Sequence, residues 1–442
     1  MTRKEKIAWT ASTVAKPWVA MDCPVIGTCR DAELRVDSEK TFQRILGWGG
    51  CFNEKGWEAM KVLSELDRHQ LLKSIFDPVE GCHFNVCRVP IGANDYSWDL
   101  YSLNETVGDY AMEHFSLNRD RQRLIPYVKA AMEIQPQLRI WGSPWTPPHW
   151  LKTTSAYTFG ALKNDDSSLN AYALYFSKFV KAYRDEGIDV FAVMPQNEPC
   201  WNNRDYPACG WECDQFVRFV KSHLIPVFHR EQTNCEVWIG TMVDSKYGDI
   251  RLNVDYITRL LNEESLRGKI AGVGCQYGED LMRQTHANYP EVILMQTETD
   301  CGSGTNDWKY AKQQFDSVRT YLECGASYYM LWNMVLSEAG RSVAGWRQSA
   351  PVTVHSETGA VTYNPQFHMF KHFSHFVMPG ARRMILSGDT GDGVAFKNPD
   401  GSHVVVLQNS SSEAQETTLD MGGALIRPRI PPQSWNTFVL PG

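Results

Sequence analysis

Two glutamates stand directly after apolar runs in the middle of the chain. Glu198 ends the stretch VFAVMPQNE, and Glu298 ends the stretch VILMQTE. An unpaired carboxylate is costly in apolar surroundings, so each must face a cavity or a partner. Two carboxyl groups over one pocket suit the cleavage of glycosidic bonds: one protonates the leaving oxygen, and the other attacks the anomeric carbon or activates water. A structural salt bridge is the alternative explanation for such a glutamate.

Tryptophans and an amide accompany the two glutamates. Asn197 immediately precedes Glu198 and is placed to bind a sugar hydroxyl, and the segment SPWTPPHWLK holds Trp145 and Trp150 in a proline-stiffened loop. Large aromatic residues often fill protein cores, but a polar, proline-rich loop is a poor core segment. An indole beside an Asn, Asp or Arg matches both the C–H face and the hydroxyls of a sugar. The pattern therefore favours a carbohydrate ligand.

Strand-like and helix-like segments alternate through the centre of the chain. The strand candidates are Ile45–Phe52, Phe84–Pro90, Leu138–Gly142, Val190–Met194, Glu236–Thr241, Ile270–Gln276, Val292–Thr297 and Ala326–Asn333. The clearest helix candidates, with apolar residues every three or four positions, are Trp57–Ile75, Arg121–Ile134, Leu169–Arg184, Cys213–Phe228, Val254–Leu266 and Ala311–Leu322. Eight such units predict an α/β fold with a (β/α)8 barrel, whose catalytic groups lie at the carboxyl ends of its strands. A doubly wound sheet is the alternative, but the sequence has no glycine-rich nucleotide loop.

Both ends of the chain have the pattern of β structure. From about Met384 onward the sequence alternates like a set of strands, with a turn signal at Asn398–Gly401. The segment Ile7–Thr41 is also strand-like. We therefore expect the two ends to share one antiparallel side domain.

Composition excludes several classes of protein. The 442 residues include 44 Lys and Arg against 51 Asp and Glu, a net charge of -7, which disfavours binding to the backbone of a nucleic acid. No apolar run reaches the 18 residues that a membrane span needs. The first 20 residues contain no continuous apolar core, so no secretory signal is visible and a cytoplasmic location is expected.

The twelve cysteines are predicted to be buried free thiols, because a reducing compartment disfavours disulfides. The tightest group, Cys200, Cys209 and Cys213, lacks the paired spacing of a zinc site. Three histidines share one face of the helix-like stretch 367–376, with no acidic residue interleaved, and are expected to be packed or solvated. We expect no metal and no other cofactor.

A series of motifs runs from about Phe42 to Arg383. The blocks are GWGGCFNE (47–54), CRVPIGANDYSW (87–98), SPWTPPHWLK (143–152), MPQNEP (194–199), MQTETDCGSG (295–304), YYMLWNMVLSEAG (328–340) and NPQFHMFKHFSHFVMPGARR (364–383). In this order and spacing they resemble glycoside hydrolase family 30, most closely its glucosylceramidase and β-glucosidase branch. The resemblance implies a (β/α)8 TIM barrel over residues 42–380, fused to a β-sandwich built from residues 1–41 and 381–442.

The resemblance also implies roles for individual residues. The chain would be a retaining β-glycosidase, with Glu198 as the acid/base and Glu298 as the nucleophile. Arg88 would support the nucleophile region, and Asp95 would hold sugar hydroxyls. Four further residues match positions that line the sugar-binding subsite: Trp145, Asn197, Tyr277 and Trp332.

The sequence departs from the family pattern at three places. The His-x-Tyr of glucosylceramidases is Cys275-Gln276-Tyr277 here, a change that bears on the acid/base and on leaving-group contacts. Glu54 stands where the first block commonly has an aspartate. The loop Cys200–Asp214 follows the proposed acid/base without a clear counterpart, so we expect it to influence aglycone specificity.

Several functions stay open at the level of sequence. A β-glucoside is the favoured substrate, while sister branches of the family act on β-xylosides, β-fucosides and β-1,6-glucans. A catalytically silent sugar-binding relative is a different class, disfavoured because both glutamates and the tryptophans are present. A metal-dependent barrel hydrolase would need clustered His and Asp ligands at strand ends, which the sequence lacks.

Overall fold

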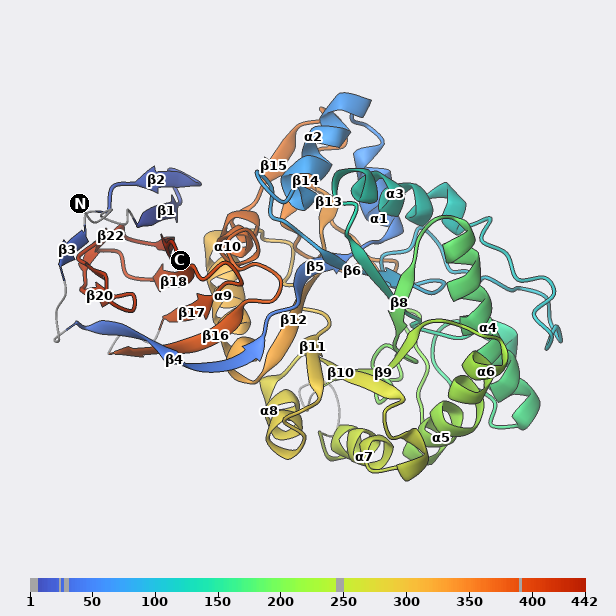
Figure 1. Cartoon of the computed structure of the whole chain (residues 1–442). Helices are drawn as coiled ribbons and strands as arrows, with labels where there is room; N and C mark the ends of the chain where they lie inside the picture. The colour runs from blue at the N-terminus through green and yellow to red at the C-terminus, as the bar shows by residue number, and fades with distance from the viewer. Residues whose placement is uncertain (1–6, 24, 28–31, 244–249, 389–391) are drawn as a thin grey trace.

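A closed barrel of eight parallel strands forms the larger part of the molecule (Figure 1). The computed structural model describes residues 7–23, 25–27, 32–243, 250–388 and 392–442. The barrel strands are β5 (Gly47–Cys51), β6 (Val86–Pro90), β7 (Arg139–Ser143), β8 (Val190–Val193), β9 (Glu236–Val243), β10 (Ile270–Gln276), β11 (Ile293–Gln296) and β12 (Ala326–Asn333). Neighbours along the chain are neighbours in the barrel, and β12 closes it against β5. All eight predicted strands are confirmed.

Alternation along each strand separates two sets of side chains, as the pleat requires. On β6, Cys87 and Val89 point outward and pack with the helices, whereas Val86 lies in the interior cluster. That interior cluster also contains Trp141, Trp238, Met295, Tyr328 and Met330. Bulky side chains thus fill the barrel as a packed core rather than a pore.

Helices cover the outside of the barrel. They are α1 (Glu54–Met60), α2 (Glu65–Phe76), α3 (Leu124–Ile134), α4 (Asp166–Asp185), α5 (Cys213–Arg218), α6 (Ile225–Arg230), α7 (Ile250–Leu261), α8 (Glu279–Asn288), α9 (Trp308–Glu323) and α10 (Pro365–Ser374). Short 3-10 turns cover Asp120–Gln122, His149–Leu151 and Glu264–Leu266, and a π-helical turn, Phe219–Leu224, joins α5 to α6. The single helix predicted over Trp57–Ile75 is wrong, because Ser64 caps a new helix by accepting from the backbone N–H of Asp67.

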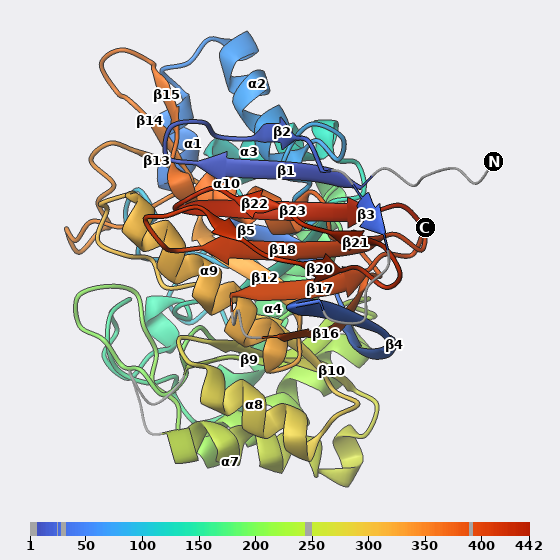
Figure 2. The same cartoon turned by 90° about the vertical axis from the view of Figure 1, so that its left-hand side faces the viewer.

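Strands from both ends of the chain form the side domain, which Figure 2 shows face on. The order in its ten-stranded sheet is β2-β1-β23-β18-β17-β16-β4-β20-β21-β3. The amino-terminal members are β1 (Ala8–Thr13), β2 (Val19–Met21), β3 (Val25–Gly27) and β4 (Leu34–Arg44). The carboxyl-terminal strands of the domain are β16 (Arg382–Gly388), β17 (Gly393–Lys397), β18 (His403–Asn409), β19 (Gln415–Glu416), β20 (Leu419–Asp420), β21 (Leu425–Ile426), β22 (Arg429–Ile430) and β23 (Ser434–Leu440). β19 and β22 form a separate pair, and β13 (Val335–Ser337), β14 (Val352–Val354) and β15 (Val361–Tyr363) form a small sheet after the barrel.

Pairing of β1 with β23 and of β4 with β16 confirms that both ends build one side domain. The boundaries predicted at 41/42 and 380/381 stay a prediction; β4 itself runs to Arg44. On β18, Val404 and Val406 pack into the core of the barrel, while Val405 and Leu407 pack into the core of the side domain. One strand therefore belongs to two hydrophobic cores.

The histidines of α10 lie at this seam. Buried His372 contacts the hydroxyls of Ser12, at 2.9 Å, and Thr437, at 2.8 Å. His375 Nδ1 lies 2.8 Å from the carbonyl oxygen of Gly81. Both side chains are packed as expected, and His372 joins α10 to strands from both ends of the chain.

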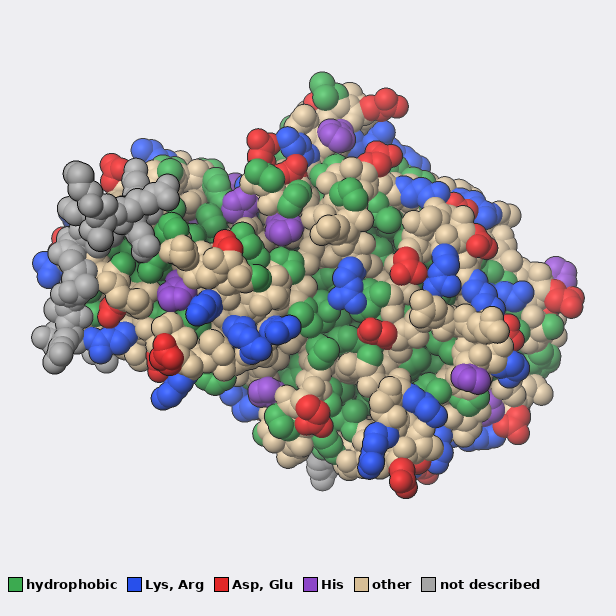
Figure 3. Space-filling view, in the orientation of Figure 1, with side chains coloured by type: hydrophobic (Ala, Val, Ile, Leu, Met, Phe, Trp, Pro, Cys, Tyr) green, Lys and Arg blue, Asp and Glu red, His purple; other side chains and the backbone are tan. Residues whose placement is uncertain are grey.

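Other features of composition are also visible in the fold. No disulfide joins the eleven cysteines of the described ranges; Cys29 lies outside them. Lys and Arg side chains are interspersed with Asp and Glu on the face shown in Figure 3. Within the described residues, no helix has the length and apolar character needed to cross a membrane.

Candidate active site

The carboxyl ends of the barrel strands bring the eight predicted site residues together. Arg88 lies on β6 and Trp332 on β12, while the others follow a strand end: Asp95, Trp145, Asn197, Glu198, Tyr277 and Glu298. None of the eight is highly exposed, and Arg88 is completely buried. This is the end of the barrel at which the sequence predicted the chemistry.

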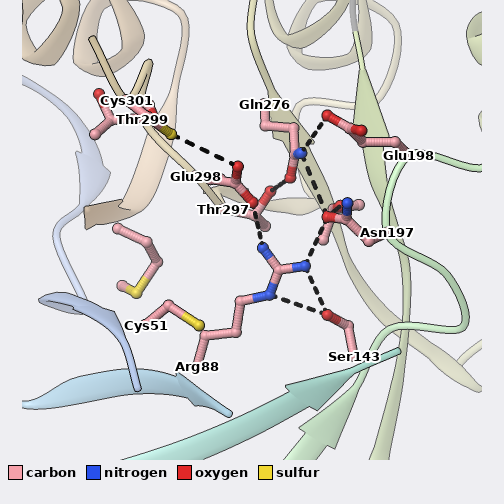
Figure 4. Close-up of polar contacts among 12 residues, drawn as sticks. Cys51, Arg88, Ser143, Asn197, Glu198, Gln276, Thr297, Glu298, Thr299 and Cys301 are labelled. Carbon is pink, nitrogen blue, oxygen red and sulfur yellow. Dashed lines mark hydrogen bonds and ion pairs between the residues drawn. The ribbon is translucent and has the colours of Figure 1, made fainter. Parts of the chain in front are cut away.

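Arg88 is the centre of the polar network in Figure 4. Its Nη1 donates to Glu298 Oε2 at 2.8 Å, and its Nη2 donates to Asn197 Oδ1 at 2.7 Å. Both Nε and Nη2 also donate to the hydroxyl of Ser143, at 3.0 and 2.7 Å. The guanidinium carbon lies 4.0 Å from the ring centroid of Trp145. A rigid planar cation therefore connects one glutamate to the neighbour of the other.

Glu298 has hydrogen-bond donors on two sides. Arg88 binds one carboxylate oxygen, and the hydroxyl of Tyr277 donates to the other. Cys301 Sγ lies 4.0 Å from the latter oxygen and 3.2 Å from the Tyr277 hydroxyl. A cavity of about 560 Å³ opens beside Glu298 between β10, β11 and α9. A larger one, about 1160 Å³, lies among α6 and the amino-terminal ends of β8 to β10, away from these residues.

Glu198 has neutral partners instead. Gln276 Nε2 donates to its Oε1 at 3.1 Å, and the hydroxyl of Tyr206 donates to its Oε2 at 3.0 Å. Among the described residues, no cation lies within 4.0 Å of this carboxylate. The backbone of Glu198 has φ +50°, a left-handed conformation that costs a non-glycine residue about 1 kcal/mol or more. Strain of this kind is common at functional sites, because the surrounding structure must impose it.

Burial and neighbouring charges shift the pKa values of the two glutamates. Burial, followed by the negative charge of Glu298, raises the pKa of Glu198 to about 7, although hydrogen bonds from Tyr206 and Gln276 oppose the shift. Burial also raises the pKa of Glu298, and Arg88 and Tyr277 oppose it. Burial and the same two glutamates raise the pKa of Asp95 well above its usual value. Glu198 is therefore mostly protonated below about pH 7, while Arg88 favours the anion at Glu298.

Aromatic rings near the carboxylates form one packed cluster, which includes Tyr96, Trp145 and Trp332. Trp145 and Trp332 pack at 5.1 Å between centroids, and Tyr96 meets Trp332 nearly perpendicular at 6.3 Å. The indole N–H of Trp332 is buried and has no hydrogen-bond partner among the described residues. A sugar hydroxyl is the kind of acceptor that would satisfy such a group.

Cys275 stands where the family pattern has a histidine, but side chains alternate along β10 and its side chain lies on the outer face. Cys275 points outward and packs in the core between barrel and helices, so its side chain is not beside the acid/base. Gln276, the next residue, points inward and contacts Glu198. Gly274 shares that inward face, where a Cβ would lie 2.6 Å from Thr297 Cγ2; the missing side chain lets Thr297 approach.

Glu54 has a structural role rather than a place in the cavity. It is buried and accepts two hydrogen bonds from Arg119, at 2.8 and 2.9 Å, and one from the backbone N–H of Trp98. A charge that is buried and fully paired in this way anchors the start of α1.

Sequence reasoning missed several residues of the site. Ser143 lies in the motif SPWTPPHWLK and Tyr206 in the loop Cys200–Asp214, but no local pattern indicates their contacts with Arg88 and Glu198. Tyr206 also meets Trp346 nearly perpendicular, at 5.4 Å between centroids, across the loops that follow β8 and β12. Gln276 stands beside Tyr277 in the motif, but the strand pattern does not show which of positions 275 and 276 faces inward.

The fold and the paired carboxylates define a glycoside-cleaving barrel enzyme, and comparison with known proteins agrees. The model of the glycosyl hydrolase family 30 TIM-barrel domain matches residues 45–377, and that of the family 30 beta sandwich domain matches residues 380–438. The chain therefore belongs to glycosyl hydrolase family 30.

Similar proteins include some named glucosylceramidases and others named endo-1,6-beta-glucanases. Putative glucosylceramidase 2 of Caenorhabditis elegans is 30% identical over 85% of this chain and 76% of its own length. Endo-1,6-beta-D-glucanase neg1 of Aspergillus fumigatus is 27% identical over 90% of this chain and 85% of its own length. The solved structure of the endo-beta1,6-glucanase BT3312 has the same fold, with a TM-score of 0.89, 22% identity and coverage of 99% of this chain and 100% of that one.

Proposed function

We propose that this chain is a retaining β-glycosidase that hydrolyses β-glucosides, with Glu298 as the nucleophile and Glu198 as the acid/base. One observation carries the assignment of roles. Arg88 and Tyr277 bind Glu298, whereas the two neutral donors Gln276 and Tyr206 bind Glu198. A cation favours an ionised nucleophile, and a buried carboxyl beside that anion keeps its proton.

The reaction has two steps in this proposal. Ionised Glu298 attacks the anomeric carbon, the bond to the leaving oxygen breaks, and that oxygen takes the proton of Glu198. Glu198, now ionised, accepts a proton from water as the water oxygen attacks the anomeric carbon and releases Glu298. Each step inverts the anomeric centre, so the product keeps the substrate's configuration.

The remaining predicted residues would bind the sugar. Trp145 and Trp332 offer rings for its C–H faces, and the unpartnered N–H of Trp332 would donate to a hydroxyl. Asn197 uses Oδ1 to accept from Arg88 and Thr241, which reserves its Nδ2 for a substrate hydroxyl. Asp95, which is buried and feels the charges of both glutamates, would bind another hydroxyl.

A β-glucoside with a free terminal sugar is the substrate we favour. The names of the glucosylceramidase relatives support glucose as the sugar. The contact of Tyr206 with Trp346 supports a closed wall rather than an open cleft at that side of the mouth. Internal cleavage of β-1,6-glucan is the second candidate, supported by the similarity to neg1 over most of both chains.

The first test is a panel of p-nitrophenyl β-glycosides: glucoside, xyloside, fucoside and galactoside. We expect the highest kcat/KM on the glucoside and, by proton NMR, the β-anomer of glucose as the first product. An α-anomer would contradict retention, and release of oligosaccharides rather than glucose from β-1,6-glucan would favour the second candidate.

The nucleophile has its own test. We expect Glu298→Ala to lose at least about a thousandfold in kcat, because the covalent step has no other nucleophile. Mass spectrometry after incubation with 2,4-dinitrophenyl 2-deoxy-2-fluoro-β-glucoside should place the label on the peptide that contains Glu298. A label on another residue would contradict the assignment. Unchanged turnover in Glu298→Ala would do the same.

A further inference from the structure

We propose that Gln276 confines the catalytic proton to one oxygen of Glu198, Oε2, and is thus a positioning residue for acid/base catalysis. The inference rests on the proposed function of Glu198. Its basis is a set of hydrogen bonds that fixes the orientation of two side-chain amides (Figure 4).

The amide of Gln276 has a donor on one side and acceptors on the other. Its Oε1 accepts from the hydroxyl of Thr297 at 3.0 Å. Its Nε2 donates to Glu198 Oε1 at 3.1 Å and faces Asn197 Oδ1 at 3.4 Å. Turning the amide over would bring Oε1 against two acceptors, so the network determines its orientation.

Asn197 is fixed in the same way. Its Oδ1 accepts from Arg88 at 2.7 Å and from the hydroxyl of Thr241 at 3.0 Å. Arg88 is a permanent donor and is itself paired with Glu298. Arg88 therefore fixes the orientation of the Asn197 amide, and Asn197 in turn fixes that of the Gln276 amide. All three side chains are buried.

The two oxygens of Glu198 consequently have different partners. An amide NH2 can only donate, and the carbonyl oxygen of a protonated carboxyl accepts better than its hydroxyl oxygen, so the contact with Gln276 favours Oε1 as the oxygen without the proton. The hydroxyl of Tyr206, 3.0 Å from Oε2, can donate to an ionised carboxylate or accept from a protonated one. Oε2 is therefore the oxygen that the hydrogen bonds favour as the proton carrier in both parts of the cycle.

Other charged and titratable groups face Glu198, but none makes this distinction. They are Glu298, Arg88, Asp95, Tyr206 and Tyr277, from the ends of four different strands. Gln276 is neutral at every pH, so its contact persists through the cycle. The position of Tyr206 at Oε2 also marks where the leaving oxygen must arrive, which places its loop beside the aglycone.

The test compares two leaving groups in Gln276→Leu. A phenyl β-glucoside needs a proton on its leaving oxygen, whereas a 2,4-dinitrophenyl β-glucoside hardly does. We expect kcat/KM to fall about 10- to 100-fold for the phenyl substrate and less than about threefold for the dinitrophenyl substrate. We also expect the alkaline limb of the phenyl pH profile to move upward, because the variant lacks a donor to the ionised form.

Gln196→Leu is the matched control. Gln196 is an equally buried glutamine two residues before Glu198, but it donates to the carbonyl of Trp145 and does not touch the carboxylate. Gln196→Leu should lower kcat/KM by the same factor for the phenyl and the dinitrophenyl substrate. Equal losses in Gln276→Leu would overturn the proposal, since a merely structural role predicts them.

Thr297→Val is the second variant, and it covers the case in which Gln276→Leu does not fold. It keeps Gln276 but removes the hydroxyl that orients the amide, so the same substrate selectivity should appear at smaller amplitude. Equal effects on both substrates would again overturn the proposal. The comparison uses whichever aryl β-glycosides the wild type hydrolyses. If the preferred sugar is not glucose, the substrate proposal is wrong but the test of Gln276 still applies.

Discussion

The two glutamates differ in their partners more than in their burial, since both are nearly inaccessible to solvent. Glu298 has a permanent cation and a phenol, and Glu198 has an amide and a phenol that can reverse its role. A buried carboxyl without a cation prefers to be neutral. The proposed acid/base role of Glu198 rests on its neutral partners, Gln276 and Tyr206.

The pH dependence of activity should report Glu198. Glu198 must carry its proton in the first step, and its pKa is raised to about 7, so kcat/KM should fall as pH rises through about 7. The alkaline fall should be pronounced for the phenyl β-glucoside and slight for the dinitrophenyl β-glucoside, whose leaving oxygen hardly needs the proton. An equal fall for both substrates would assign the limb to another group.

The same residue should lower stability at high pH. Its pKa is about 7 in the folded protein against an ordinary 4.5, so folding favours the neutral form. That contribution is present below pH 4.5 and is lost as pH rises toward 7, by up to about 3 kcal/mol. Glu198→Gln stays neutral, so its Tm relative to wild type should be higher at pH 8 than at pH 4. A difference in Tm that is the same at both values would contradict this.

Whether a strand residue points into or out of the barrel decides which site contacts the sequence could predict. The motif placed Glu198, Glu298, Arg88 and Tyr277 at strand ends, and the barrel brings them together. The cysteine at position 275, where the family has a histidine, suggested a change beside the acid/base. Cys275 points outward from β10 and cannot reach the cavity, and it is Gln276 that contacts Glu198. Whether position 275 or 276 faces inward depends on the barrel, which the strand pattern alone does not orient.

At the scale of elements, buried strands were easier to predict than helix boundaries. All eight barrel strands are short apolar runs, and such runs have few other places in a barrel fold. α8, EDLMRQTHAN, was missed because it is largely polar, and the break before α2 depends on a single capping serine. Loop contacts such as Tyr206 with Trp346 join segments about 140 residues apart, so local patterns carry no sign of them.

The contact between the β8 and β12 loops predicts an effect on the aglycone. Trp346→Ala removes the ring that meets Tyr206, so the loop Cys200–Asp214 loses support on one side of the mouth. We expect KM for an alkyl β-glucoside with a long chain to rise several-fold, because aromatic contacts contribute about 1 kcal/mol. Hydrolysis of methyl β-glucoside, which has almost no aglycone, should change less. Equal changes for the two substrates would place Trp346 outside the aglycone subsite.

At the scale of the whole molecule, the side domain and the barrel share a hydrophobic core. Val394, Phe396, Val404 and Val406 of the side domain pack with barrel residues, and Trp435 stacks on Trp308 of α9 at 3.8 Å between centroids. The side domain needs both ends of the chain, and its inner face needs the barrel. We therefore expect calorimetry to show one cooperative transition for the two parts.

Trp435→Ala tests this coupling. Trp435 is 1% exposed, so its truncation should cost roughly 3–5 kcal/mol and lower Tm by several degrees. Because the barrel shares that core, activity should be lost at the same lowered temperature as the calorimetric transition. Trp98→Ala, at a tryptophan that is 55% exposed, is the control and should change Tm little. Two separate transitions in Trp435→Ala, with activity following only the upper one, would show that the barrel is stable without the side domain.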